Sequence, residues 1–146
     1  SAIDIFVKGD SIITVGGLKS GANVYKATYW VSNVTNTISN EESYAEKISF
    51  IGDDMYTCGD RSNATVDDEI LYWKNGVEHP LENPTTFQMV INDMFTFGND
   101  VYIAGNEWNV DEPSLARYWK NGKLYNITTD YTYEHRAIAN GIFVVE

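Results

Sequence analysis

The sequence predicts an all-β protein built from repeated four-stranded antiparallel units, and three observations support this prediction. A similar segment occurs three times, at 13–30, 56–73 and 102–119, which gives a repeat of 43 to 46 residues. Aromatic residues make up 14% of the 146 residues, and Val, Ile and Thr are abundant, as is typical of strands. No part of the repeat shows helical periodicity, so each unit is expected to consist of strands.

Each copy repeats the same glycine, tryptophan and aliphatic positions. The glycine stands fourteen residues before a tryptophan that follows a tyrosine, and an aliphatic residue comes eight residues after that tryptophan. The repeated glycines and tryptophans are Gly16, Gly59, Gly105, Trp30, Trp73 and Trp119. Because structural repetition accounts for these tryptophans, we interpret them as packing between neighbouring sheets rather than as sugar-stacking residues.

The second copy shows its strands most clearly. Alternation and turn residues predict four strands, at 47–51, 55–58, 69–73 and 77–81. Asn75-Gly76 separates the last two, since Asn-Gly supplies the positive φ angles that a two-residue hairpin requires. The third copy repeats this turn at Asn121-Gly122, and the first copy has the less regular Ser32-Asn33.

Four short antiparallel strands with a period in the low forties are typical of a β-propeller blade. We therefore predict that residues 1–146 form a single β-propeller array of about three and a half blades. The predicted blades cover 1–40, 45–82 and 87–128, and a half blade at 133–146 has strands at Tyr133–Ala139 and Ile142–Val145. Closed propellers have ~4–8 blades, so we expect either a fragment of a longer propeller or a homodimer formed through the terminal blades.

The repeat resembles that of uncharacterised bacterial β-propeller proteins with tandem "VYVAG…YWKNG…L" repeats. DVYIAG at 100–105 and YWKNG at 118–122 match closely, and YWKNG at 72–76 matches fully. The first copy departs after its tryptophan, with YWVSN at 29–33. The resemblance covers nearly the whole chain and implies an exported, periplasmic or cell-surface propeller, but it brings no catalytic residues.

Charge and composition narrow the range of partners. The net charge of -11 argues against nucleic acid and anionic membranes, since both require clustered Lys and Arg. No apolar stretch approaches the roughly 20 residues of a spanning helix, so no membrane insertion is expected. The single cysteine, Cys58, permits no disulfide within the chain and is expected in the core.

The variable loops are expected to form an acidic face. They join second to third strands, or one copy to the next, and lie at 17–23, 60–68, 106–113 and near 40–44, 82–86 and 129–133. With their flanking residues they hold twelve of the 21 acidic residues, whereas Lys8, Lys74 and Lys120 belong to turns on the opposite face. Because loops on a rigid scaffold usually carry binding residues, we expect a ligand at the acidic face.

Trp108 is the main candidate for ligand contact, because it is the only tryptophan outside the repeated position. Four further residues of the same face are Glu107, Asp111, Tyr131 and Tyr44. Together they predict an aromatic and acidic platform for a glycan, a peptide or a protein. The alternative is that Trp108 folds back on its own sheet as a loop anchor.

No cofactor is expected and no catalytic residue is assigned. Calcium could bind at Asp67–Glu69 or Asp111-Glu112, but neither loop has the register of a dedicated site. His79 and His135 belong to no recognisable triad or metal-ligand spacing. We therefore expect a non-enzymatic binding or scaffold module, with two alternatives: a glycan-acting enzyme that uses loop carboxylates, or a purely structural repeat domain.

Overall fold

The computed structural model describes residues 1–62, 69–85, 87–108, 113–128 and 137–145. These residues contain twelve strands and no helix, arranged as three four-stranded antiparallel sheets. The predicted all-β fold of four-stranded antiparallel units is therefore confirmed. The chain divides into two compact units, Ser1–His79 and Pro80–Glu146, and each is described by itself.

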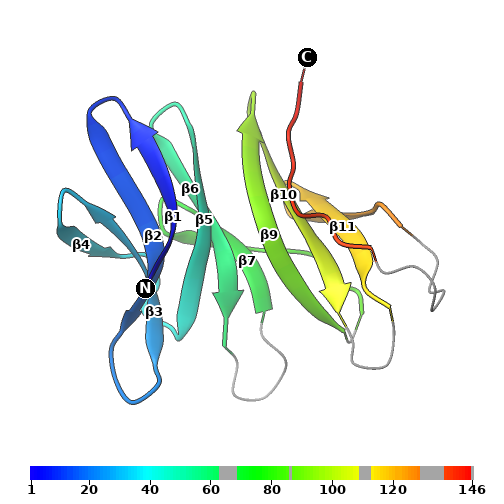
Figure 1. The fold of residues 1–146 in the computed structure, drawn as a ribbon, viewed down its shortest axis with the longest axis horizontal. Helices are drawn as coiled ribbons and strands as arrows, with labels where there is room; N and C mark the ends of the chain where they lie inside the picture. Colours follow the sequence, from blue (N-terminus) through cyan, green and yellow to red (C-terminus); the bar gives the residue numbers. More distant parts are fainter. Residues whose placement is uncertain (63–68, 86, 109–112, 129–136, 146) are drawn as a thin grey trace. The chain divides into compact units, whose positions relative to one another are not determined.

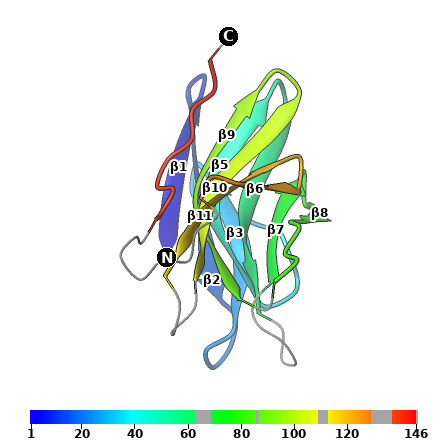
Figure 2. The same cartoon turned by 90° about the vertical axis from the view of Figure 1, so that its right-hand side faces the viewer.

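The strands follow one another in chain order within every sheet (Figure 1). The first sheet contains β1 (Ala2–Lys8), β2 (Ser11–Lys19), β3 (Tyr25–Val31) and β4 (Val34–Thr37). The second sheet contains β5 (Ser43–Ile51), β6 (Asp54–Arg61), β7 (Glu69–Lys74) and β8 (Val77–Pro80). The third sheet contains β9 (Gln88–Phe97), β10 (Asp100–Trp108), β11 (Leu115–Lys120) and β12 (Lys123–Asn126), and Figure 2 shows its long β9–β10 hairpin from the side.

The four strands expected in the second copy are all present, but β5 and β6 continue beyond the predicted ends. Their ladder runs on to the pair Ser43 and Arg61 after a register shift between Ala45 and Lys47. The sequence pattern changes at this bulge, because the inserted residue reverses the alternation of faces. The polar residues of the expected loop therefore include part of a strand.

The two-residue turns have the backbone that their sequences predict. Asn75 and Gly76 have φ angles of 51° and 82°, and Asn121 and Gly122 have 52° and 85°. The less regular Ser32-Asn33 adopts the same handedness, with φ angles of 48° and 67°. All three turns thus have positive φ at both central residues, which suits the twist of the flanking strands.

The repeated Lys-Asn-Gly turn is tied to the adjoining hairpin by the asparagine side chain. Asn75 Oδ1 accepts a bond of 2.9 Å from Met55 N, and Asn75 Nδ2 donates one of 2.8 Å to Asp54 Oδ1. In the third sheet Asn121 Nδ2 donates an equivalent bond of 2.7 Å to Asp100 Oδ1. The turn asparagine therefore recurs for a structural reason beyond its tolerance of positive φ.

The repeated glycines lie opposite β-bulges, where two strands approach too closely for a side chain. A Cβ atom at Gly16, Gly59 or Gly105 would lie 1.9, 1.9 or 2.0 Å from the carbonyl oxygen of Ser1, Tyr44 or Val90. None of these three glycines has a positive φ angle. The repeat therefore requires glycine for space, not for backbone freedom.

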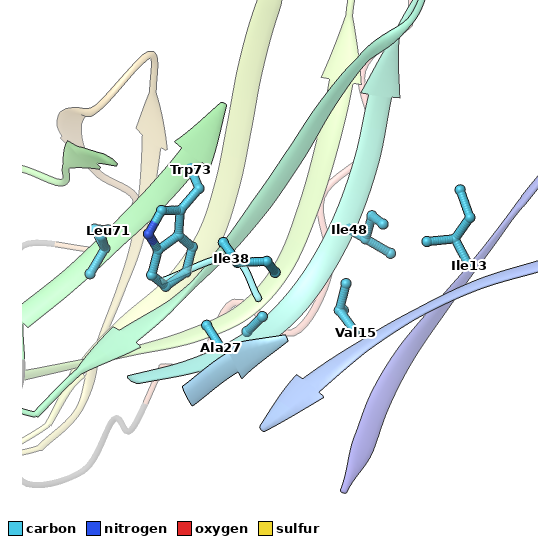
Figure 3. Close-up of a cluster of buried hydrophobic side chains, with 8 residues drawn as sticks. Ile13, Val15, Ala27, Ile38, Ile48, Leu71 and Trp73 are labelled. Carbon is cyan, nitrogen blue, oxygen red and sulfur yellow. The ribbon is translucent and has the colours of Figure 1, made fainter. Parts of the chain in front are cut away.

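A buried apolar cluster joins the first and second sheets within the Ser1–His79 unit (Figure 3). One face of the first sheet contributes Ile13 and Val15, and the facing side of the second sheet contributes Ile48 and Trp73. Ile38, from the connector between the sheets, packs in the same cluster. Apolar residues of both sheets are thus removed from water together, which stabilises the stack.

The C-terminal segment differs from the predicted half blade. Ile142–Val145 forms no strand, and Ala137–Ala139 is not in a strand either, while 133–136 lie outside the described residues. Instead, Ile142 N donates a bond of 2.9 Å to Asp93 Oδ2 on β9, and the Phe143 ring lies 4.8 Å from that of Phe95. The segment therefore binds side chains of the third sheet, and the expected second strand is wrong because no strand ladder forms there.

Candidate functional site

An open polar hollow of about 770 Å³ is lined by the second sheet and the connector before it, within the Ser1–His79 unit. Three parts of the chain line it: 38–42 after β4, 61–62 at the end of β6, and Gly76 with Glu78 at the β7–β8 turn and the start of β8. The hollow therefore contains part of the connector between the first two sheets, where the sequence predicts binding residues. The structure adds the β7–β8 turn, which the loop prediction did not include.

Arg61 is the central charged group of this hollow. Its Nη1 lies 2.7 Å from Glu78 Oε2, and its Nη2 pairs with Glu69. The hydrogen bond to Glu69 is the main reason that the pKa of Arg61 is raised above its ordinary value. The guanidinium is therefore already matched by two carboxylates, before any other acidic residue is considered.

Additional carboxylates make the hollow negative. Glu41 and Glu42 line it beside Glu78, and both belong to the connector. Ser39 Oγ orders this connector, because it accepts a bond of 3.2 Å from Glu41 N and lies 3.4 Å from Glu78 Oε1. The arrangement favours a ligand group that carries positive charge and several hydrogen-bond donors.

A second acidic feature lies at the bulge of β5. Burial, followed by the charge of Asp60, raises the pKa of Glu46 from 4.5 to about 7. The residue at the equivalent bulge of the third sheet is Asn92, whose Nδ2 donates a bond of 2.9 Å to Asn106 Oδ1. A protonated carboxyl can also donate. We therefore interpret Glu46 and Asp60 as the structural counterpart of the amide pair.

The two neighbouring candidates Glu107 and Trp108 have different environments. Glu107 is 2% exposed, and its Oε2 lies 2.6 Å from Arg117 Nη2 and 3.2 Å from Arg117 Nε. Arg117 Nη1 also donates a bond of 2.7 Å to the Thr128 carbonyl, so the ion pair is anchored to the backbone. Trp108 is 38% exposed at the end of β10 and remains available to a ligand.

Tyr44 lies in the other unit and is held by its neighbours. Its ring centroid is 4.8 Å from that of Tyr25, and its edge packs against Gly17. Burial and the hydrogen bond with Tyr25 raise the pKa of Tyr44 to about 12, so its hydroxyl is neutral at pH 7. Since Asp111 and Tyr131 lie outside the described residues, the predicted platform stays a prediction.

The proposed calcium loops fall mostly outside the described residues, which include Glu69 but not 67–68 or 111–112. The Glu69 carboxylate pairs with Arg61, as described above. His79 stacks on Tyr72, with ring centroids 4.8 Å apart and planes 10° apart, whereas His135 is not described. The described part of the chain gathers no three His, Cys, Asp or Glu side chains that could hold a metal ion.

The lysines of the opposite face do not make that face positive. Each lies beside an aspartate: Lys8 with Asp53 at 2.9 Å, Lys74 with Asp54 at 2.8 Å, and Lys120 with Asp100 at 2.7 Å. The expected contrast between an acidic and a basic face is therefore weaker than the sequence suggests. These aspartates adjoin the turns in sequence, but only the structure reveals the neutralisation, because Lys74 and Lys120 pair across neighbouring strands and Lys8 pairs with the next sheet.

The repeated tryptophans differ in exposure. Trp73 and Trp119 are fully buried, and Trp119 Nε1 donates a bond of 2.9 Å to the Glu82 carbonyl. Trp30 is only partly buried and lines a separate hollow of about 430 Å³ in the first sheet. A ligand in solution could therefore reach Trp30 but not the other two.

Comparison with protein-family models, with curated proteins and with solved structures finds no match. The candidate site accordingly depends on the residues of this chain alone. The described residues contain no helix with the length and apolar character needed to cross a membrane.

Proposed function

We propose that this chain is a propeller-type repeat module that binds a positively charged peptide or protein segment without catalysing a reaction. The observation that carries the proposal is the open hollow in which Glu41 and Glu42 add negative charge beside an Arg61 that Glu69 and Glu78 already neutralise. Lys and Arg side chains of a ligand offer the charge and the donors that this arrangement lacks.

The repeat supports the propeller part of the proposal. Three consecutive sheets share the strand order, the glycine opposite a bulge and the tryptophan on the third strand. In a propeller, stacked sheets form a scaffold that presents the connecting loops as a binding face. An exported or cell-surface location, which the resemblance implies, belongs to the same proposal.

Binding of a fluorescent hexa-arginine peptide, followed by anisotropy at two salt concentrations, tests the ligand class. The double variant Glu41→Gln/Glu42→Gln is expected to weaken binding about fivefold, since each exposed charge pair contributes modestly. The control is Asp10→Asn, an exposed acid in the β1–β2 turn, combined with Asp53→Asn to give the same change in charge.

An equal loss in both double variants would mean that the peptide responds only to net charge, which contradicts a site at the hollow. No binding by the wild-type chain would favour the purely structural alternative. A panel of neutral oligosaccharides, tested in parallel, would show binding through Trp108 if the glycan form of the prediction holds, and Trp108→Ala should then abolish it.

A further inference from the structure

A repeated contact covers the tryptophan of two sheets. In the third sheet, Trp119 Nε1 donates to the Glu82 carbonyl, and Glu82 N donates a bond of 2.8 Å to the Gly122 carbonyl. Leu81, which precedes Glu82, is buried. In the second sheet, Trp73 shares its cluster with Ile38, which has the same position in the repeat as Leu81. An aliphatic connector residue therefore accompanies each buried tryptophan.

The first sheet leaves one half of this contact open. We define its open face by Ile5, Val7, Ile12, Thr14 and Trp30, which share one side through the pairs of the ladder. The equivalent side of the second sheet carries Ile48 and Trp73, which are buried against the first sheet. On the open face Ile5, Val7 and Ile12 are exposed, and Trp30 lines the hollow of about 430 Å³.

The third sheet leaves the other half open. Ile127 has the repeat position of Ile38 and Leu81, yet it is 54% exposed, compared with 8% and 5% for those residues. Its backbone is held in the same way: Ile127 N donates a bond of 3.1 Å to Ala116 O, as Ile38 N donates one of 2.8 Å to Ala27 O. The Ile127 side chain is thus exposed at the repeat position where the side chains of Ile38 and Leu81 are buried.

We propose that the open face of the first sheet docks the third sheet of a second copy of this chain, with Ile127 entering the hollow beside Trp30. The contact would continue the packing that already joins the first and second sheets. A second copy is the occupant that the observations favour, because the same chain exposes both halves of one repeated interface. Such a contact is heterologous, so it joins copies head to tail.

The C-terminal segment competes with this docking. In the contact between the first two sheets, Asp4 Oδ2 accepts a bond of 3.0 Å from Ile48 N. Asp93 has the same place beside the bulge of the third sheet, and its Oδ2 accepts a bond from Ile142 N. Ile5 has the repeat position of Ile48, so a docked copy would donate the N–H of its Ile5 to Asp93. The bond between Ile142 N and Asp93 must therefore break before the copy can dock.

Light scattering behind a sizing column, over a series of concentrations in 0.15 M salt, tests the interface. The wild-type chain is expected to form species of at least twice 16.5 kDa. Trp30→Ala and Ile127→Asp should each weaken self-association at least tenfold. Val77→Asp changes an equally exposed apolar residue on β8 and should leave association unchanged. Circular dichroism and thermal melting check that every variant is folded.

Mixing the two weakened variants identifies the geometry. Trp30→Ala retains Ile127, and Ile127→Asp retains Trp30, so a mixture should form one-to-one dimers through the remaining intact pair. Failure to form this mixed dimer, when wild type associates, would overturn the proposal in favour of a different interface.

A further variant tests the competing segment in the full chain. Ile142→Pro removes the N–H that binds Asp93 and should tighten self-association at least tenfold, because the segment leaves more easily. The proposal is wrong if wild type and Ile142→Pro both stay monomeric at the highest concentration. It is also wrong if Ile127→Asp associates as tightly as wild type.

Discussion

Substitution of a repeated glycine provides the most direct test of how the sheets are built. At Gly59, an added Cβ atom would lie 1.9 Å from the Tyr44 carbonyl oxygen and 3.2 Å from the Ala45 Cα. Ordinary contact with a carbonyl oxygen begins at about 3.4 Å, so β5 and β6 would have to separate by more than 1 Å at the bulge. The obstacle is backbone, which cannot rotate away as a flexible side chain does.

We expect Gly59→Ala to reduce the free energy of unfolding by about 3 kcal/mol, the upper part of the range for overpacking. Urea denaturation followed by tryptophan fluorescence measures this loss. With a slope of about 2 kcal/mol/M for a chain of this size, the midpoint should fall by roughly 1.5 M. The matched control is Gly21→Ala, where the nearest atom to an added Cβ is 3.8 Å away and no positive φ is required.

The control should change the free energy of unfolding by no more than about 0.5 kcal/mol. If Gly59→Ala and Gly21→Ala had the same midpoint, the close approach at the bulge would not limit the residue at this position. The structural reason given for the repeated glycine would then be wrong, and its recurrence would need another cause.

Three further predictions concern buried groups. Arg117→Met should destabilise the chain by about 3–5 kcal/mol in urea denaturation because it removes the positive charge from the buried Glu107 carboxylate, and Glu107→Gln in the same chain should restore part of the loss. Burial raises the pKa of Glu46 from 4.5 to about 7, so the folded chain holds the proton more tightly than the unfolded chain. The free energy of unfolding should therefore fall by about 3 kcal/mol as pH rises from 4.5 to 8, and Glu46→Gln should remove this fall in urea titrations at several pH values. Trp119→Phe should lower the free energy of unfolding by about 1 kcal/mol more than Trp73→Phe, measured by thermal unfolding. Trp119 loses its hydrogen bond to the Glu82 carbonyl, whereas Trp73 Nε1 has no acceptor among the described residues, so equal losses of stability would contradict this reasoning.

The sequence predicts the repeat and its strands because both depend on local chemistry. Asn75-Gly76 and Asn121-Gly122 require positive φ angles, and alternation marks the strands beside them. The positions of the repeated glycines and tryptophans are visible in the sequence for the same reason. They recur at fixed distances from these turns, so no knowledge of distant contacts is needed to find them.

The candidate site could be predicted only in part. The acidic character of Glu41 and Glu42 is evident from their place in a connector, but Glu78 belongs to a strand, and only its contacts with Arg61 and Ser39 show that it lines the same hollow. Glu107 and Trp108 are adjacent in sequence, yet one is buried in an ion pair and the other is exposed. Alternation around a bulge does not indicate which neighbour faces the core, so burial could not be assigned from the sequence.

The sequence by itself therefore determined the all-β character, the four-stranded unit and its turns, since these follow from residue type and spacing along the chain. Only the tertiary structure decided which charged groups are neutralised, why glycine recurs beside each bulge, and what residues 137–145 contact. Those features depend on atoms that are distant in sequence but adjacent in space. The physical reason is that packing and charge pairing act across strands, whereas propensity and turn geometry act along them.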